Sequence, residues 1–144
     1  MTAYADTGFL VSLYLTESTS KAADKALSAN HQPLPLTLLG RLEMRNAFNL
    51  AVKWRRITAA ERDALWQDVE ADIASGFLVP TTVPAADLHT KAWELSGRYS
   101  PAVGTRSLDL LHVAAAVLLK TNTFFSFDER QRQAAAGEGM KVKP

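Results

Sequence analysis

Two kinds of apolar pattern alternate along the chain. Some apolar runs are too short for an ordinary helix and are typical of buried strands. They predict strands at residues 2–6, 33–39, 76–83, 123–127 and, at the end, 140–143. The segments between them are mostly longer, and residues 40–56 place apolar residues near the spacing of one helix face. They predict helices at residues 8–15, 20–29, 40–56, 58–75, 84–99, 107–120 and 128–137.

Local signals support some of these boundaries. Thr58 is followed three residues later by Glu61, which is the pattern of a capping box at the start of a helix. Pro84 is typical of a helix start, because the first turn needs no N–H from that position. The stretch SPAVGTR at residues 100–106 is predicted to be a loop.

Strands that alternate with helices predict the α/β class, with a mainly parallel central sheet covered by helices on both faces. The chain has 144 residues, a length typical of one domain, so we expect a single domain over residues 1–144. Its share of apolar residues, 47%, and of charged residues, 22%, is that of an ordinary globular protein rather than a disordered one.

Composition also limits the compartment and the chemistry. The chain has no cysteine, which excludes a disulfide framework and a thiolate zinc site. It shows no secretion signal at its N-terminus and no apolar run of the ~18 residues that a membrane span needs. We therefore expect a cytoplasmic protein that does not enter a membrane. The net charge of +1 favours no class of partner.

Four acidic residues from distant segments are predicted to meet at one edge of the sheet. Asp6 and Asp128 each follow a predicted strand, and the carboxyl ends of parallel strands share an edge. Glu43 falls near the first turn of the helix that follows a strand, which is close to the same edge. Asp109 opens a helix that runs back across the sheet, so it also starts there. The sequence thus predicts an acidic edge.

Each acid also has an ordinary structural role open to it. Asp6 and Asp128 could cap helices, an interaction worth about 1 kcal/mol each. Asp109 could interact with the helix dipole, and Glu43 could pair with a neighbouring arginine. The remaining acids are expected at the far edge or on outward helix faces, among them Glu17 and Asp24.

The surroundings of the acids favour a metal ion. Asp109 and His112 are nearly alone as polar residues of an apolar helix, and three positions apart they share a face. We expect His112 to hydrogen-bond to Asp109 rather than to bind metal. Carboxylates in apolar surroundings are costly unless a cation or hydrogen bonds compensate them. Oxygen ligands without cysteine or a histidine cluster favour Mg²⁺ or Mn²⁺ over zinc.

Two other classes of protein are disfavoured. The stretch YADTGFLVSLYL contains Asp-Thr-Gly, which is also the catalytic tripeptide of aspartic proteases. Those all-β enzymes place it in a loop between strands, whereas here it leads directly into a predicted helix. A receiver-like signalling domain would need an acid at the end of its central strand, and the stretch FLVPTTV has none.

Four stretches resemble, in order, the signature blocks of PIN-domain nucleases, especially VapC-type toxins of toxin–antitoxin pairs. They are YADTGFLVSLYL, RLEMRNAF, TRSLDLLHVAAA and FFSFDERQRQAA, and together they span almost the whole chain. The resemblance implies a three-layer α/β/α sandwich and a metal-dependent endoribonuclease. Gly8 departs from the pattern, because relatives commonly carry serine, asparagine or another small side chain there.

The resemblance also assigns residues to roles. The family's acidic quartet, which would hold Mg²⁺ or Mn²⁺ for phosphodiester hydrolysis, matches Asp6, Glu43, Asp109 and Asp128. Thr7 and Asn46 match positions that hydrogen-bond to such carboxylates and fix their orientation, and we expect the same of His112. Arg106, just before Asp109, would contact a substrate phosphate.

Partners are also implied by the resemblance. They are an RNA substrate (tRNA, rRNA or mRNA), a small antitoxin protein and a second copy of the chain in a homodimer. Leu10, Leu13 and Tyr14 on the first predicted helix are candidates for an antitoxin groove, although burial against the sheet explains them equally well. Two alternatives stay open: a PIN-fold nuclease with another target, such as DNA or precursor rRNA, and a nucleic-acid-binding module outside a toxin–antitoxin system.

Overall fold

The structure is a computed structural model that describes residues 2–144. Every predicted helix and strand is present, although the strands are shorter than predicted. The helices are α1 (Thr7–Tyr14), α2 (Ser20–Ser28), α3 (Leu38–Lys53), α4 (Ala59–Ser75), α5 (Ala85–Val103), α6 (Ser107–Leu118) and α7 (Glu129–Gly137). The strands are β1 (Ala3–Ala5), β2 (Leu34–Leu36), β3 (Leu78–Pro80), β4 (Thr123–Phe125) and β5 (Lys141–Lys143).

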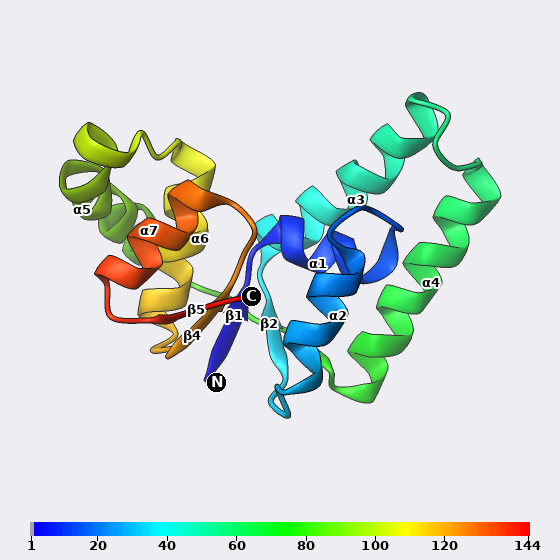
Figure 1. The fold of residues 1–144 in the computed structure, drawn as a ribbon, viewed down its shortest axis with the longest axis horizontal. Coiled ribbons are helices and arrows are strands. Elements are labelled where there is room, and N and C mark those ends of the chain that lie inside the picture. Colours follow the sequence, from blue (N-terminus) through cyan, green and yellow to red (C-terminus); the bar gives the residue numbers. More distant parts are fainter. Residues whose placement is uncertain (1) are drawn as a thin grey trace.

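All paired strands are parallel, as predicted. They form one sheet in the order β1-β4-β5 and a separate pair, β2-β3, rather than one continuous central sheet. β2 lies beside β1 without a regular ladder of hydrogen bonds between them (Figure 1). Pro35 contributes to this break, because it occupies the middle of the three-residue β2 and has no backbone N–H to donate.

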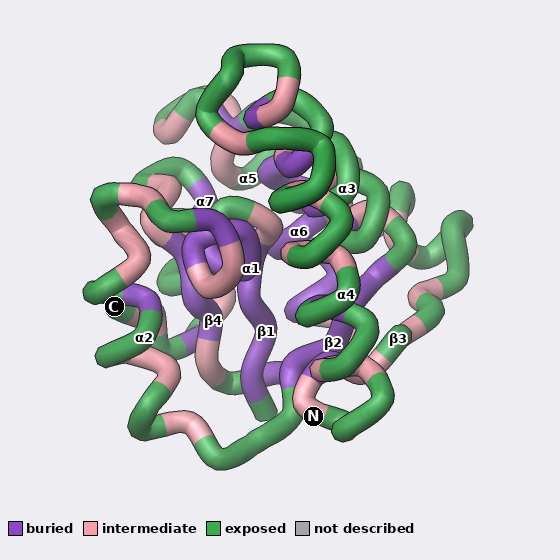
Figure 2. Tube along the Cα trace, turned by 90° about the vertical axis from the view of Figure 1, so that its right-hand side faces the viewer, coloured by how far each residue is buried: buried purple, intermediate pink, exposed green. Residues whose placement is uncertain are grey.

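The strands separate two helical layers, so the predicted three-layer α/β/α arrangement is confirmed. Helices α1 to α4 lie on one side of the strands and α5 to α7 on the other (Figure 1). Neighbouring strand residues point to opposite faces: Ala5 and Phe125 enter the core under α1, whereas Tyr4 and Phe124 enter the core under α6. Figure 2 shows burial concentrated in β1, β2 and β4, with α4 largely exposed.

One predicted loop is wrong. Residues 100–103 continue α5, which contains Pro101 in its last turn. A proline removes one backbone hydrogen bond, and near a helix end this loss is smaller than in the helix interior. The helix stops instead at Gly104, whose φ of 75° is a left-handed conformation that favours glycine. The predicted capping box of Thr58 and Glu61 is confirmed at the start of α4.

Helix α1 is more deeply buried than a surface that binds a partner would be. Leu10 is only 1% exposed and belongs to the core, so it does not offer a surface to a partner. Leu13 and Tyr14 are partly buried and pack against the same core. As for membranes, the helices within residues 2–144 are all too short or too polar to cross one.

The contact between α5 and the end of α7 gives a first prediction. A Cβ atom added at Gly137 would lie 2.6 Å from Cε1 of Tyr99, and the hydroxyl group of Tyr99 donates to Glu138. We expect Gly137→Ala to lower the free energy of unfolding by about 1–3 kcal/mol, because the Tyr99 ring must move. Gly97→Ala, at an exposed position of α5 with open space around it, should instead stabilise by up to about 1 kcal/mol. Urea unfolding measures both, and equal effects would contradict the packing described.

Candidate active site

Asp6 lies at the junction of β1 and α1, at the edge where the sequence predicts it. Its side chain is almost completely buried, at 3% exposure. Oδ1 accepts a hydrogen bond from the N–H of Phe9 at 2.8 Å, and Oδ2 accepts one from the hydroxyl group of Ser126 at 2.5 Å. Burial raises the pKa of Asp6, and the hydrogen bonds from Ser126 and Phe9 offset this only in part. The site therefore contains a carboxylate whose charge is incompletely compensated.

Ser126 links Asp6 to Asp128. It follows β4, is fully buried, and accepts a hydrogen bond from the backbone N–H of Asp128 at 3.0 Å while it donates to Asp6. Asp128 caps α7, with its Oδ1 accepting from the N–H of Gln131 at 3.0 Å. One serine thus fixes two acids of neighbouring strands. The sequence reasoning missed Ser126, whose signal was a polar residue inside the apolar run FFSF.

Asp109 lies in the first turn of α6 and is 8% exposed. Its Oδ2 accepts a hydrogen bond from the backbone N–H of Arg106 at 3.0 Å, and its Oδ1 accepts one from Nε2 of Gln131 at 3.2 Å. The Arg106 side chain is largely exposed, with its Nε 3.9 Å from Asp109 Oδ2. Arg106 therefore lies beside the acids, with most of its guanidinium group in solvent.

Glu43 is held in place by two donors. Its Oε1 accepts from the hydroxyl group of Thr7 at 2.8 Å and lies 2.6 Å from Nε2 of His112, which donates because a carboxylate only accepts. Burial by itself raises the pKa of Glu43, but the hydrogen bond and charge of His112 and the hydrogen bond from Thr7 outweigh it, so the pKa is lowered. Thr7 thus contacts a carboxylate in the way the sequence predicts.

The predicted hydrogen bond between His112 and Asp109 is wrong. The Asp109 carboxylate turns back to the start of its own helix, whereas the His112 ring lies one turn further along and faces Glu43. His112 is 2% exposed, and its Nδ1 lies 2.7 Å from the hydroxyl group of Tyr4 on β1. Burial raises the pKa of Tyr4, so that hydroxyl group stays protonated and pairs with the ring nitrogen. His112 therefore supports Glu43 rather than Asp109.

Two pockets open along this acidic edge, and both include Gly8 in their lining. The first, of about 370 Å³, is also lined by Asp6, Asp128 and Gln131. The second, of about 340 Å³, is also lined by Thr7, Glu43 and Asn46. Asn46 is exposed and lines this second pocket with Glu43, but within residues 2–144 its side chain makes no hydrogen bond to that carboxylate. A Cβ atom at Gly8 would lie 3.7 Å from Asp6 Oδ1, so a small side chain would fit there.

Glu17 also lies at this edge, which contradicts its predicted place at the far edge or on an outward helix face. It lines both pockets, accepts a hydrogen bond from Ser12 at 3.3 Å, and lies 3.7 Å from the guanidinium group of Arg56. The reason is that α1 is only eight residues long and the chain after it turns back along the helix, where Ser12 also contacts Thr19. Strand and helix order alone does not reveal such a return.

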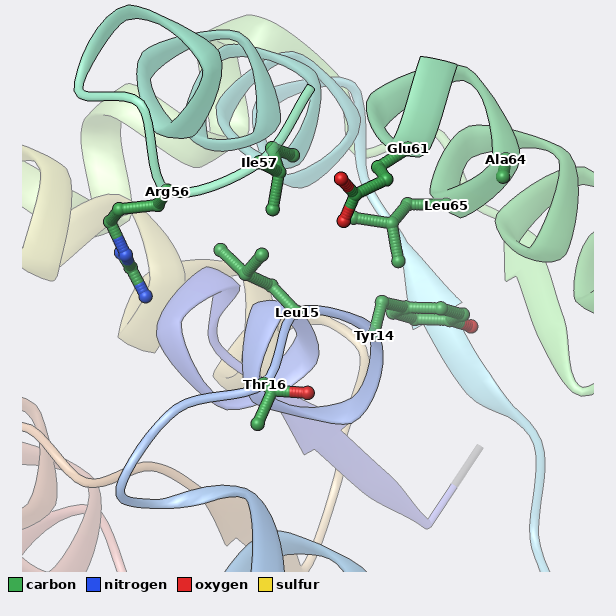
Figure 3. Close-up of a pocket in the computed structure, with 8 residues that line it drawn as sticks. All are labelled: Tyr14, Leu15, Thr16, Arg56, Ile57, Glu61, Ala64 and Leu65. Atoms are coloured by element: carbon green, nitrogen blue, oxygen red, sulfur yellow. The ribbon is translucent and has the colours of Figure 1, made fainter. Parts of the chain in front are cut away.

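A separate groove lies between the end of α1 and the start of α4. Its volume is about 370 Å³, and Figure 3 shows the side chains of Leu15, Ile57 and Leu65 pointing into the same space. Tyr14 lines the groove as well, and Arg56 brings a charge to it. We call this surface the α1–α4 groove.

Comparison with known proteins places the chain in a family. The sequence model of the PIN domain matches residues 3–137, nearly the whole chain. The chain belongs to the PIN domain family. A search of curated proteins finds no significant match.

Three solved structures resemble this PIN domain. VapC20 of Mycobacterium tuberculosis, a sarcin–ricin loop cleaving toxin, is 21% identical with a TM-score of 0.68, covering 99% of this chain and 100% of that one. FitAcB of Neisseria gonorrhoeae is 16% identical with a TM-score of 0.68, covering 99% and 96%. A toxin–antitoxin complex of Klebsiella pneumoniae is 17% identical with a TM-score of 0.65, covering 99% and 97%. At these identities the likeness shows a shared fold.

The donor atoms of the PIN domain suit a hard divalent cation. They are carboxylate oxygens, and cysteine is absent from the sequence. Oε2 of Glu43 and Oδ2 of Asp128 make no hydrogen bond to the described residues and are free to bind a ligand. Within residues 2–144, no three acidic or histidine side chains lie close enough together to hold a metal ion between them. Mg²⁺ commonly keeps several water molecules and binds proteins through only one or two carboxylates.

The raised pKa of Asp6 predicts an unusual effect on stability. A folded-state pKa above the unfolded value means that the ionised carboxylate destabilises the fold at neutral pH, and that this cost disappears as the pH falls through the folded pKa. Asp6→Asn should therefore raise the Tm of the metal-free PIN domain at pH 7, by more than the ~0.5 kcal/mol of an ordinary surface substitution. Asp24→Asn, at an exposed position of α2, is the matched control. Thermal unfolding in EDTA decides, and a lower Tm for Asp6→Asn would contradict the burial cost.

Proposed function

We propose that this PIN domain is a metal-dependent endoribonuclease, the toxin of a toxin–antitoxin pair, acting in the cytoplasm. The observation that supports this most strongly is the set of four acids at one edge, each held by at least one hydrogen bond: Asp6, Glu43, Asp109 and Asp128. VapC20, which shares the fold, is a sarcin–ricin loop cleaving toxin, and another structure with this fold belongs to a toxin–antitoxin complex.

The four acids would hold Mg²⁺ or Mn²⁺. Such an ion, when bound, lowers the pKa of water and stabilises charge on phosphate oxygens. Glu43 has a specific part in this proposal, because Thr7 and His112 occupy Oε1 and leave Oε2 free to bind the ion and to orient the attacking water. The buried ring of His112 and the hydroxyl group of Tyr4 behind it would keep that carboxylate in one orientation.

Arg106 would bind the RNA backbone. Its side chain is 73% exposed and starts beside Asp109, so its remaining N–H groups are free to donate to phosphate oxygens. The proposed substrate class is tRNA, rRNA or mRNA. A PIN-fold nuclease with a DNA target, or a nucleic-acid-binding module, is the alternative.

The α1–α4 groove is the surface that we propose for a small antitoxin. Its apolar side chains would bury those of a short segment, and Arg56 and Glu61 at its rim would pair with charges on that segment. Arg56 also lies near Glu17 at the acidic edge, so a partner in this groove would reach toward the acids.

The proposed test is cleavage of labelled tRNA and rRNA by the purified chain with Mg²⁺ or Mn²⁺. We expect discrete fragments, and a loss of at least ~100-fold in rate with EDTA or Asp6→Asn, because a metal ion contributes several kcal/mol to such reactions. Asp24→Asn should cut like the wild type. A folded chain that cuts no RNA with either ion would contradict the proposed function, and cutting of DNA alone would favour the alternative.

A homodimer would use the apolar residues beside the same edge. Leu38 and Leu42 at the start of α3 are 77% and 67% exposed, and Leu108 at the start of α6 is half exposed. The hydrogen bond between His112 and Glu43 brings these two helix starts together. A second copy packed there would bury these leucines.

This proposal predicts that Leu42→Glu weakens self-association at least tenfold, because a charge would be buried in the interface. Sedimentation equilibrium measures the effect. Gln133→Glu, at an exposed position of α7, adds the same charge elsewhere and should leave self-association unchanged. A wild-type chain that stays monomeric at high concentration would contradict the homodimer.

A further inference from the structure

Gln131 contacts two of the four acids at once. Its backbone N–H donates to Asp128 Oδ1 at 3.0 Å, which fixes the residue in the first turn of α7. Its side-chain Nε2 donates to Asp109 Oδ1 at 3.2 Å, across the gap between α7 and α6. The residue is 7% exposed and lines the pocket that contains Asp6. Such contacts hold the side chain in one orientation.

The other end of this amide is unusual. Within residues 2–144, Oε1 of Gln131 is the one buried side-chain nitrogen or oxygen atom without a hydrogen-bond partner. Turning the amide over would not solve this, because the oxygen would then face the carboxylate of Asp109 and both atoms only accept. The orientation with an unpaired oxygen is therefore the favoured one.

The other polar side chains that line this pocket also lack a free donor. Asp6, Asp128 and Glu17 line the same pocket, and their carboxylates only accept. The hydroxyl groups of Ser12 and Thr19 in that lining contact each other at 2.6 Å. A buried acceptor among acceptors is satisfied by a cation or by a water molecule.

We propose that Gln131 is a fifth, uncharged oxygen donor of the acidic site, serving a bound divalent cation directly or through a water molecule while its Nε2 holds Asp109. This inference rests on the proposed metal-dependent function. An amide is suited to the position because its oxygen adds a ligand without adding a fifth negative charge to the four carboxylates.

Two substitutions separate this role from a purely positioning one. Gln131→Met keeps the bulk but removes the oxygen and the Nε2 donor. Gln131→Glu keeps an oxygen and adds a charge, but also loses the Nε2 donor to Asp109. Gln133→Met is the matched control, since Gln133 is exposed on the same helix and bonds only to Glu129. Mn²⁺ affinity of the full chain, measured by electron paramagnetic resonance without RNA, is the readout.

We expect Gln131→Met to weaken Mn²⁺ binding by about tenfold or more, the usual effect of losing a supporting group at a metal site. Gln131→Glu should bind Mn²⁺ at least as tightly as the wild type and should have a lower Tm in EDTA, because its added charge faces Asp109. Gln133→Met should match the wild type. Thermal unfolding of each variant establishes that it is folded.

Three results would overturn the inference. Equal weakening in Gln131→Met and Gln131→Glu would mean that the residue only positions Asp109, since both lose that hydrogen bond. Suppose that the wild type binds Mn²⁺ and cuts RNA. If both variants then bind Mn²⁺ as tightly as the wild type, Gln131 is not part of the metal site, and the proposed function is unaffected. A wild type that neither binds Mn²⁺ nor cuts RNA would overturn the proposed function as well.

Discussion

The cost of keeping carboxylates charged in a partly buried space is the constraint on which the rest of this structure depends. Asp6 and Asp109 are almost fully buried, and the pKa of Asp6 stays raised by that burial in spite of two hydrogen bonds. Such an arrangement persists only if the surrounding elements hold it rigidly. The two apolar cores on either side of the strands supply that rigidity, because neither can shift without disturbing the other.

The hydrogen bonds of the site cross all three layers of the fold. Tyr4 comes from the sheet, His112 from the layer of α5 to α7, and Glu43 from the layer of α1 to α4, and they form one chain of contacts. Ser126 makes a second link between the neighbouring strands β1 and β4. Asp6, Glu43 and Asp109 each accept a hydrogen bond from a side chain distant in the sequence, so their positions depend on the whole fold being formed. Asp128 is held locally, at the start of the helix that it caps.

Chain topology, which the sequence predicts well, is enough to bring the four acids to one edge. Asp6 and Asp128 end parallel strands and must therefore lie at that edge, and the positions of Glu43 and Asp109 result from helix direction. The sequence could not supply the directions of side chains across helices, which is why the predicted pairing of His112 with Asp109 is wrong and the contact with Glu43 is found instead. Ser126 and Gln131 were missed for the same reason. Local sequence signals also gave wrong predictions where packing between distant segments determines the structure. Pro101 lies inside α5 rather than in a loop, and Glu17 lies at the acidic edge.

Whether the acidic edge binds a divalent metal ion is tested most directly by diffraction from crystals soaked in Mn²⁺, using the anomalous signal of manganese. The expected result is a peak at the edge defined by Asp6, Glu43, Asp109 and Asp128, within reach of at least two of their carboxylates. An acidic edge without a peak at saturating Mn²⁺, or a peak found only elsewhere on the molecule, would contradict a metal site at this edge.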